Sequence, residues 1–258
     1  MKTLKIIKIG GNIIDDAVVL DDFLKAFSKI EGPKILVHGG GKLATKLAHQ
    51  MGVKVNMIDG RRITDAATLD IITMVYAGKI NKSIIAMLQA QQCNAVGFTG
   101  ADGNTIESVQ RPVKDINFGY VGDVQKVNTE TTNLLLAGNV TPVFCAITHN
   151  TKGQLLNTNA DTVASELAIG FAELYHTELY YCFEKSGVLI DVSNEDSVIE
   201  KINNNNYQDL KNQGIIADGM LPKLENCFHA IANNVQKVCI GKPEMLFNSN
   251  SKFTTIQD

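Results

Sequence analysis

Two segments of the chain place consecutive glycines directly after an apolar run. Residues 8–12 read KIGGN and residues 37–42 read VHGGGK. Glycines let the backbone approach a ligand and turn N–H groups toward anionic oxygens, and a helix that begins there adds the positive end of its dipole. Lys8 would stand at the carboxyl end of a strand, where open α/β sheets place ligands. Both segments are predicted to hold anionic oxygens, with an ordinary turn and a surface lysine as the alternative for the first.

Arg62 and Asn157 are the polar side chains best suited to recognise a substrate carboxylate. Arg62 lies in residues 60–64 (GRRIT), and an arginine binds a carboxylate through two parallel hydrogen bonds. Asn157 lies in residues 156–161 (LNTNAD), where its amide would meet polar groups of the substrate. Thr64 is predicted to cap the helix that follows it. The alternative for the arginine pair is simple exposure to solvent.

Asp161 and Lys223 complete the charged candidates. Either Asn159 or Asp161 is suited to cap the next helix, and the functional interpretation gives Asp161 the task of holding lysine ammonium groups. Lys223 ends residues 218–223 (DGMLPK) in a first helical turn, where the dipole disfavours a cation by roughly a few tenths of a kcal/mol. That placement indicates an anion nearby, with a solvated lysine as the alternative. His38 is expected to be structural rather than a base.

Short apolar runs alternate with helical patterns along the chain. Apolar residues recur at helical spacing over residues 20–30, and a long helical pattern runs from about residue 65 towards residue 91. The Asp59-Gly60 pair predicts a hairpin within residues 53–63. Strands that alternate with helices predict a mostly parallel sheet covered on both faces. The predicted strands are residues 4–9, 34–37, 95–98, 140–147, 179–183, 187–190 and 238–240.

Composition restricts the classes of protein to consider. A length of 258 residues suits one large α/β domain or two packed lobes. A net charge of −3 offers no basic field for nucleic acid. No apolar stretch is expected to span a bilayer, and lysines interrupt the N-terminal run that a signal peptide would need. Five scattered cysteines form no metal motif and indicate a reducing, cytoplasmic location.

The ordered set of these motifs resembles the amino-acid kinase family over residues 6–242. The segments HGGG, GRRIT and NTNAD are most similar to the branch that acts on N-acetyl-L-glutamate. The resemblance implies a three-layer αβα sandwich with a central, mostly parallel open sheet. It also implies an N-terminal lobe, residues 1–177, for acylglutamate binding and dimerisation, and a C-terminal lobe, residues 178–258, for ATP.

The resemblance further implies ATP-dependent phosphorylation, with Mg²⁺, of the γ-carboxylate of N-acetyl-L-glutamate, the second step of arginine biosynthesis. The acceptor is already ionised at neutral pH, so no general base is required. No metal ligand is assigned to the protein. The implied site residues are Lys8, Lys223 and Asp161 for catalysis, Gly40, Gly41, Arg62 and Asn157 for the substrate, Gly10 and Gly11 for phosphate, and Glu184, Lys185, Ser186, Gly187, Leu189, Ile216 and the 215–219 region for the nucleotide.

The chain departs from the family pattern after the predicted strand 179–183. Glu184 stands where the family has an aspartate, and Lys185 stands where an apolar residue is usual. This departure leaves a non-catalytic amino-acid or nucleotide sensor on the same fold as one alternative. A second alternative, independent of the departure, is a kinase for N-succinyl-L-glutamate, whose acyl pocket the 53–63 hairpin would line. The chain begins almost at its first strand, without the helical extension of arginine-inhibited hexameric relatives. A homodimer without arginine feedback is therefore expected.

Overall fold

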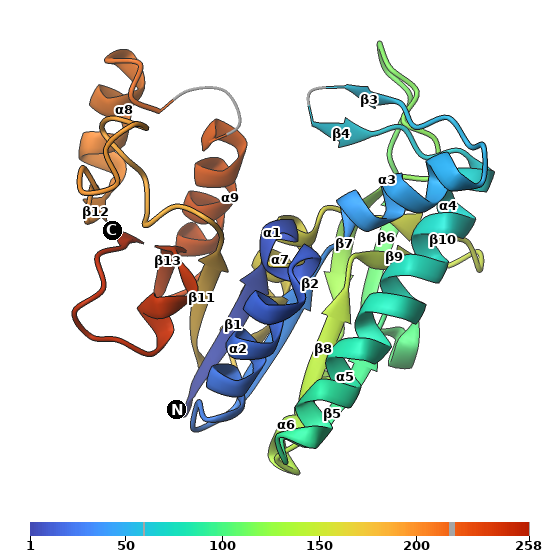
Figure 1. Cartoon of the computed structure of the whole chain (residues 1–258), viewed down its shortest axis with the longest axis horizontal. Coiled ribbons are helices and arrows are strands. Elements are labelled where there is room, and N and C mark those ends of the chain that lie inside the picture. Colours follow the sequence, from blue (N-terminus) through green and yellow to red (C-terminus); the bar gives the residue numbers. More distant parts are fainter. Residues whose placement is uncertain (59, 217–219, 258) are drawn as a thin grey trace.

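Eight strands form one twisted sheet at the centre of the molecule (Figure 1). The structure is a computed structural model that describes residues 1–58, 60–216 and 220–257. The strand order is β12-β14-β13-β11-β1-β2-β8-β5. The strands from β13 to β5 are parallel, whereas β14 runs antiparallel to β13, and β12 is parallel to β14. The predicted sheet class is confirmed. The strands are β1 (Thr3–Ile9), β2 (Lys34–His38), β5 (Ala95–Phe98), β8 (Thr141–Cys145), β11 (His176–Cys182), β12 (Lys201–Ile202), β13 (Lys237–Gly241) and β14 (Thr254–Ile256).

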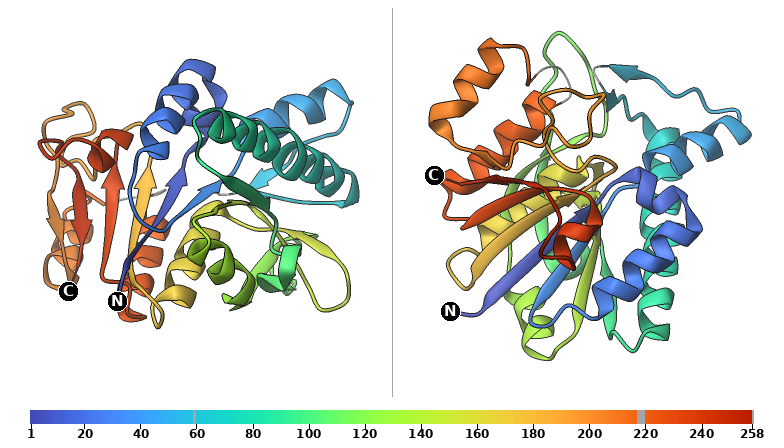
Figure 2. Two further views of the ribbon diagram at one scale, coloured as in Figure 1. Left: turned by 90° about the horizontal axis from the view of Figure 1, so that it is seen from below. Right: turned by 60° about the vertical axis from the view of Figure 1, so that its left-hand side comes forward.

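Helices cover both faces of this sheet (Figure 2). One face carries α1 (Gly11–Asp15), α2 (Ala17–Ser28), α3 (Gly41–Gln50), α4 (Ala66–Thr73) and α5 (Asn81–Ala90). The other carries α6 (Glu130–Ala137), α7 (Ala160–Phe171) and α9 (Met220–Ala232), with α8 (Asn204–Asn212) packed beside α9. Short 3-10 segments lie at Asp102–Asn104 and Pro243–Leu246.

Alternation along β1 decides toward which face of the sheet Lys8 points. Ile7 and Ile9 pack into the core beneath α2, whereas Leu4 and Ile6 pack into the core beneath α7 and α9. Side chains of a strand alternate between faces, so Lys8 shares the face of Leu4 and Ile6. The strand therefore directs Lys8 toward α7 and α9.

The long helix predicted near residues 65–91 is present but changes its winding. A π-helical segment, Met74–Ile80, joins α4 to α5. By length and composition alone, residues 66–90 form one helix of 25 residues that is apolar enough to cross a membrane. Its buried side, which includes Ile72, Ile84 and Leu88, packs into the core between the sheet and α2. A buried core helix meets the same length and composition test.

A second, four-stranded sheet was not predicted. Its order is β10-β9-β6-β7, with β6 (Ile106–Gln110), β7 (Gly122–Val127), β9 (Ile147–His149) and β10 (Leu155–Asn157). Its strands are short and mix apolar with polar residues, so no long apolar run marks them. The predicted strand 140–147 is in fact two strands, β8 and the start of β9, which belong to different sheets.

The predicted hairpin is present, but the predicted helix cap and one predicted strand are not. The hairpin is confirmed as β3 (Met57–Ile58) paired with β4 (Arg61–Arg62), while its Asp59 lies outside the described residues. The helix after it is capped by Asp65, which accepts the Thr68 N–H, and the predicted cap Thr64 is wrong. Residues 187–190 form no strand, because only Leu189 bridges to Val198 there.

Candidate active site

Three charged side chains meet at the carboxyl end of β1. The Nζ atom of Lys8 lies 2.7 Å from Oδ1 of Asp161, and the Nζ atom of Lys223 lies 2.6 Å from Oδ2. Each side chain is largely buried, with 15 to 17% of its surface exposed. Lys223 also lies over the ring of Tyr181, 4.8 Å from its centroid. The structure thus joins residues from β1, α7 and α9 that are far apart in the sequence.

The start of α7 explains how Asp161 is held in this position. Asn159 is the cap: its side chain accepts the N–H groups of Asp161 and Thr162. The carboxylate of Asp161 is therefore free for the lysines, and an acid in the first turn of a helix is also favoured by the dipole. The Tyr181 hydroxyl donates to the Asp161 backbone carbonyl at 3.0 Å. These contacts settle which of the two polar residues caps the helix.

The electrostatics of this cluster leave it cationic. Burial alone would raise the pKa of Asp161, but the charges of Lys8 and Lys223 outweigh burial and hold that pKa below its ordinary value. Asp161 is thus ionised at neutral pH and balances one of the two ammonium charges. The remaining positive charge, in a largely buried site, favours an anionic ligand.

The two glycine segments leave the sheet side by side. β1 and β2 are parallel neighbours, with Ile9 beside His38, so both turns open at the same edge. Gly40 has a φ of 150°, and a Cβ there would lie 2.2 Å from Cδ1 of Ile80. A glycine is therefore required where α3 begins. The Gly10 N–H donates to the Cys182 carbonyl at 3.0 Å, so Gly10 shapes the turn, while Gly11 stands at the start of α1.

Of the two predicted carboxylate-binding residues, Arg62 borders the second glycine turn, and Asn157 contacts the strand segment that carries Arg62. Nη2 of Arg62 donates to the Gly41 carbonyl at 3.0 Å and to Oγ1 of Thr45 at 2.8 Å. Nδ2 of Asn157 donates to Oγ1 of Thr64 at 3.0 Å, and this hydrogen bond connects β10 to the segment just after β4. Thr45 was not singled out in the sequence, because its contact depends on how the hairpin crosses α3.

A family model described as the amino acid kinase family matches residues 3–242. The chain belongs to this family. Proteins named acetylglutamate kinase are 52% identical in Cytophaga hutchinsonii (95% of this chain and 94% of that protein) and 52% identical in Phocaeicola vulgatus (92% of each). Another from Bacteroides thetaiotaomicron is 49% identical over 92% of each chain. The predicted family is confirmed.

Solved structures agree on the fold of this amino acid kinase. The smu.665 protein of Streptococcus mutans has a TM-score of 0.79 at 25% identity and covers 98% of each chain. Carbamate kinase from Giardia lamblia, bound to AMP-PNP, has a TM-score of 0.70 at 15% identity, covering 100% of this chain and 99% of that one. N-acetylglutamate synthase from Neisseria gonorrhoeae has a TM-score of 0.82 at 18% identity, covering 100% of this chain and 59% of that one.

His38 is buried within this amino acid kinase rather than exposed at its site. Its Nδ1 lies 2.8 Å from the Gly39 carbonyl and its Nε2 lies 3.1 Å from Nδ2 of Asn81. Burial lowers the pKa of His38 to about 4, so the ring is neutral at physiological pH. The contacts suit a structural residue that supports the second glycine segment.

The predicted nucleotide residues do not form one exposed surface. Leu189 and Ile216 are buried, and Glu184 is exposed. Lys185 and Ser186 both bind the carboxylate of Glu195, at 2.8 and 3.2 Å.

The nucleotide roles of these residues remain predictions. Gly187 is packed so closely that a Cβ would lie 2.6 Å from Oγ1 of Thr254. Residues 217–219, the rest of the predicted segment, lie outside the described part of the chain.

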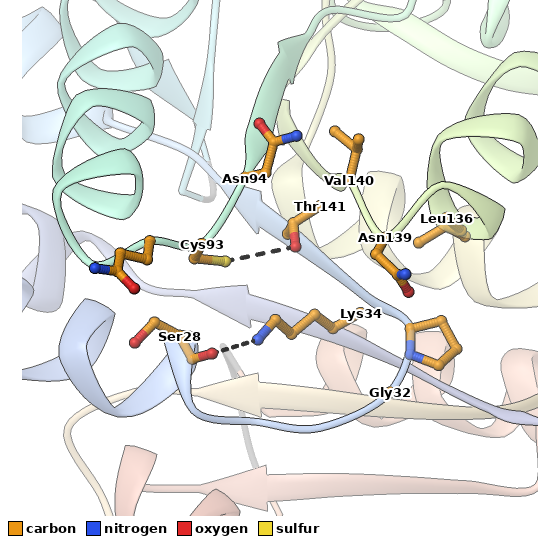
Figure 3. Close-up of a pocket in the computed structure, with 11 residues that line it drawn as sticks. Ser28, Gly32, Lys34, Cys93, Asn94, Leu136, Asn139, Val140 and Thr141 are labelled. Carbon is orange, nitrogen blue, oxygen red and sulfur yellow. Dashed lines mark hydrogen bonds between the residues drawn. The ribbon is translucent and has the colours of Figure 1, made fainter.

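A separate cavity of about 200 Å³ lies at the amino ends of β2 and β8, the opposite end of the strands from the Lys8 cluster (Figure 3). Lys34, which begins β2, points into this region, but its ammonium group already donates to three backbone carbonyls, those of Phe27, Ser28 and Ile30, at 2.7 to 3.0 Å. It therefore closes the end of α2. The cavity lacks a free charge of the kind found around Lys8.

The described residues contain no group of three or more His, Cys, Asp or Glu side chains arranged to hold a metal ion. Both oxygens of Asp161 are taken by lysines. The five cysteines are free and buried, and burial raises the pKa of Cys145 to about 12. None of them is suited to act as a nucleophile.

Proposed function

We propose that this amino acid kinase transfers the γ-phosphoryl group of ATP to the γ-carboxylate of N-acetyl-L-glutamate. The products are N-acetyl-L-glutamyl 5-phosphate and ADP, and the reaction is the second step of arginine biosynthesis. The observation that carries the proposal is the pair of lysines held on Asp161 beside two glycine turns. The relatives named acetylglutamate kinase, at 49 to 52% identity, support the choice of substrate.

The chemistry requires positioning and charge neutralisation rather than a base. An oxygen of the ionised γ-carboxylate attacks the γ-phosphorus, the bond from that phosphorus to the β–γ bridging oxygen breaks, and ADP leaves with the electron pair. No proton has to be removed from the acceptor. Lys8 and Lys223 neutralise the charge that the transferring group carries, and Asp161 keeps both ammonium groups in place.

The surrounding groups bind the two substrates. Arg62 and Asn157 bind the α-carboxylate and the neighbouring polar groups of the amino acid. Arg62 borders the second glycine turn, and Asn157 is bonded to Thr64, two residues after Arg62. The N–H groups of Gly11, Gly40 and Gly41 donate to phosphoryl or substrate oxygens. Residues 1–177 form the acylglutamate lobe, and residues 178–258 form the ATP lobe.

Magnesium enters this scheme as part of the nucleotide substrate. Within residues 1–58, 60–216 and 220–257, the carboxylate found at the cluster is that of Asp161, and two lysines engage it. Mg²⁺ commonly retains water and binds through substrate phosphates, so the ion is carried on ATP. We also place the protein in the cytoplasm as a homodimer.

Trapping of the acyl phosphate tests this proposal directly. The protein is incubated with ATP, Mg²⁺ and hydroxylamine, and N-acetyl-L-glutamate is compared with free L-glutamate. The expected result is hydroxamate and stoichiometric ADP with the acetylated substrate, and far less with the free amino acid. If neither compound yields hydroxamate while ATP still binds, a non-catalytic sensor is the better account.

A further inference from the structure

Tyr181, on β11, contacts two of the three charged residues at the candidate active site. Its ring lies beneath the ammonium group of Lys223, with 4.8 Å between Nζ and the ring centroid. Its hydroxyl donates to the backbone carbonyl of Asp161 at 3.0 Å. The residue is 1% exposed, so bulk water does not compete for either contact. One uncharged residue therefore connects α7, which carries Asp161, to α9, which carries Lys223.

The register of the main sheet explains why the ring lies at this place. Tyr181 is the partner of Lys8 in the parallel pair of β1 and β11. Partners in neighbouring strands point to the same face of a sheet, so both side chains point toward α7 and α9. Tyr181 accordingly packs in the apolar core beneath these two helices. The side chains of Lys8, Tyr181 and Lys223 thus meet on one face of the sheet.

The two lysines of the cluster are held in different ways. The backbone of Lys8 is paired on both sides, with β11 and with β2. Lys223 lies near the start of α9, where the helix dipole disfavours a cation. Its ammonium group ends a flexible stem, so its position depends on side-chain contacts. The carboxylate of Asp161 and the ring of Tyr181 supply such contacts.

An aromatic ring can hold a cation without cancelling its charge. The face of the ring attracts an ammonium group, although the side chain carries no net charge. Burial raises the pKa of Tyr181, so its hydroxyl stays protonated and donates to Asp161. A second carboxylate in this place would neutralise the cluster, whose remaining positive charge favours anionic substrates. A tyrosine therefore holds Lys223 and preserves that charge.

We propose that Tyr181 is a positioning residue for phosphoryl transfer. Its ring keeps the ammonium group of Lys223 at the cluster, and its hydroxyl holds the first turn of α7, which carries Asp161. The residue acts through these two side chains rather than on the substrates. The inference rests on the proposed function, since its effect is measured on the turnover of that reaction.

Tyr181→Leu removes both contacts and keeps an apolar side chain in the core. We expect kcat to fall about tenfold, which corresponds to about 1.4 kcal/mol and lies within the range of a desolvated contact between a cation and a ring. KM for N-acetyl-L-glutamate should stay within about twofold, because Arg62 and Asn157 are unchanged. Tyr181→Phe keeps the ring and should retain most of kcat. Steady-state ADP release measures both constants.

Tyr180→Leu is the matched control on the same strand. Tyr180 is also buried, its hydroxyl donates to Glu178 at 2.7 Å, and its ring lies 6.0 Å from Nζ of Lys237. It packs in the core on the opposite face of the sheet, beneath α2. The control therefore removes the same kinds of contact away from the cluster. Its melting temperature should fall as in Tyr181→Leu, while its kcat should equal that of the wild type.

A variant of nearly constant volume tests the ring itself, even if Tyr181→Leu does not fold. Pentafluorophenylalanine, introduced at position 181 by stop-codon suppression, is close to phenylalanine in size. Its fluorine atoms withdraw electrons from the ring, so its face no longer attracts a cation. Relative to Tyr181→Phe, we expect kcat to fall about tenfold at a similar melting temperature.

The outcomes separate the inference from the function on which it rests. If the wild type forms no acyl phosphate from N-acetyl-L-glutamate, the proposed function and the inference both fail. If the wild type is active and Tyr181→Leu has the same kcat, the inference alone fails. Equal losses of kcat in Tyr181→Leu and Tyr180→Leu would also overturn it, since they would reflect a general loss of packing. Equal kcat for phenylalanine and its pentafluoro analogue at position 181 would overturn the role of the ring.

Discussion

Asp161 controls the geometry of both lysines, because each of its oxygens contacts one ammonium group. A direct contact between two lysines would be repulsive, so the carboxylate is what permits two cations in one largely buried site. The arrangement leaves a single unbalanced positive charge in place before the substrate arrives. Preorganised charge of this kind stabilises a transition state without a cost of reorganisation during the reaction.

Replacement of either lysine by alanine tests this division of labour. Lys8→Ala or Lys223→Ala should lower kcat by roughly two to three orders of magnitude, as for loss of one preorganised donor. Steady-state ADP release measures the effect. Lys25→Ala, which removes an exposed lysine paired with Asp21 on α2, is the control and should behave as the wild type. Normal turnover in either site variant would refute the assigned roles.

Asp161 also predicts a specific pH dependence of stability. Its folded pKa is lowered from 3.8, so its stabilising contribution is fully present above pH 3.8 and is lost as the pH falls toward the folded value. Asp161→Asn should therefore lower the free energy of unfolding at pH 7 by about 3–5 kcal/mol, because two largely buried lysines lose their counter-charge.

Urea unfolding at pH 7 and at pH 3 measures both parts of this prediction. The difference in stability between wild type and Asp161→Asn should narrow at pH 3, because the carboxylate is then largely protonated in the unfolded chain while it stays ionised in the folded protein. A difference that is the same at the two pH values would show that the lysines do not lower the pKa of this group.

At the scale of elements, the strands that a sequence reveals are those with continuous apolar runs. β1, β2 and β13 are buried on both faces and were predicted within a few residues. β6 and β7 mix polar and apolar residues and were missed. The apolar run 140–147 was predicted as one strand, although the chain passes from the main sheet to the second sheet at Ala146. The residues before and after Ala146 are equally buried, so the sequence gives no sign of this change.

The same limit applies to the site. Lys8, Asp161 and Lys223 could be selected from the sequence, because each is a charged residue at the end of a predicted strand or at the start of a predicted helix. The contact of Arg62 with Thr45 depends on the crossing of a hairpin and a helix, which no local pattern specifies. Leu189 and Ile216, which the resemblance assigns to the nucleotide, are buried, and their nucleotide roles remain predictions.

Gly40 connects the second glycine turn to the π-helical segment. Gly40→Ala should destabilise the protein by roughly 3 kcal/mol or more, because its φ of 150° is strained for alanine and the new Cβ would meet Ile80. Thermal unfolding measures the loss, and KM for the acylglutamate should rise with it.

Gly32→Ala is the matched control for Gly40→Ala. It has a φ of 81° with no atom within 4 Å of the added Cβ, and should cost only about 1–2 kcal/mol of backbone strain. Equal losses in the two variants would mean that the contact with Ile80 does not constrain the turn.

At the scale of the whole molecule, β5 is the terminal strand of the main sheet in the described structure. An edge strand presents unpaired backbone groups that proteins usually cover. Val96 in the middle of β5 is 41% exposed, which is high for an apolar side chain at the edge of a sheet. Pairing of two copies across a two-fold axis would cover this edge and is consistent with the expected homodimer.

Sedimentation velocity should therefore give a species of about twice the chain mass of 28.1 kDa, with no change on addition of arginine. Val96→Lys should shift the population toward monomer, because a charge would be placed at the paired edge. Val18→Lys is the control, since Val18 is 70% exposed on α2, away from β5. A monomeric wild type, or an assembly that grows with arginine, would contradict the prediction. A dimer that persists in Val96→Lys would show that the interface does not include β5.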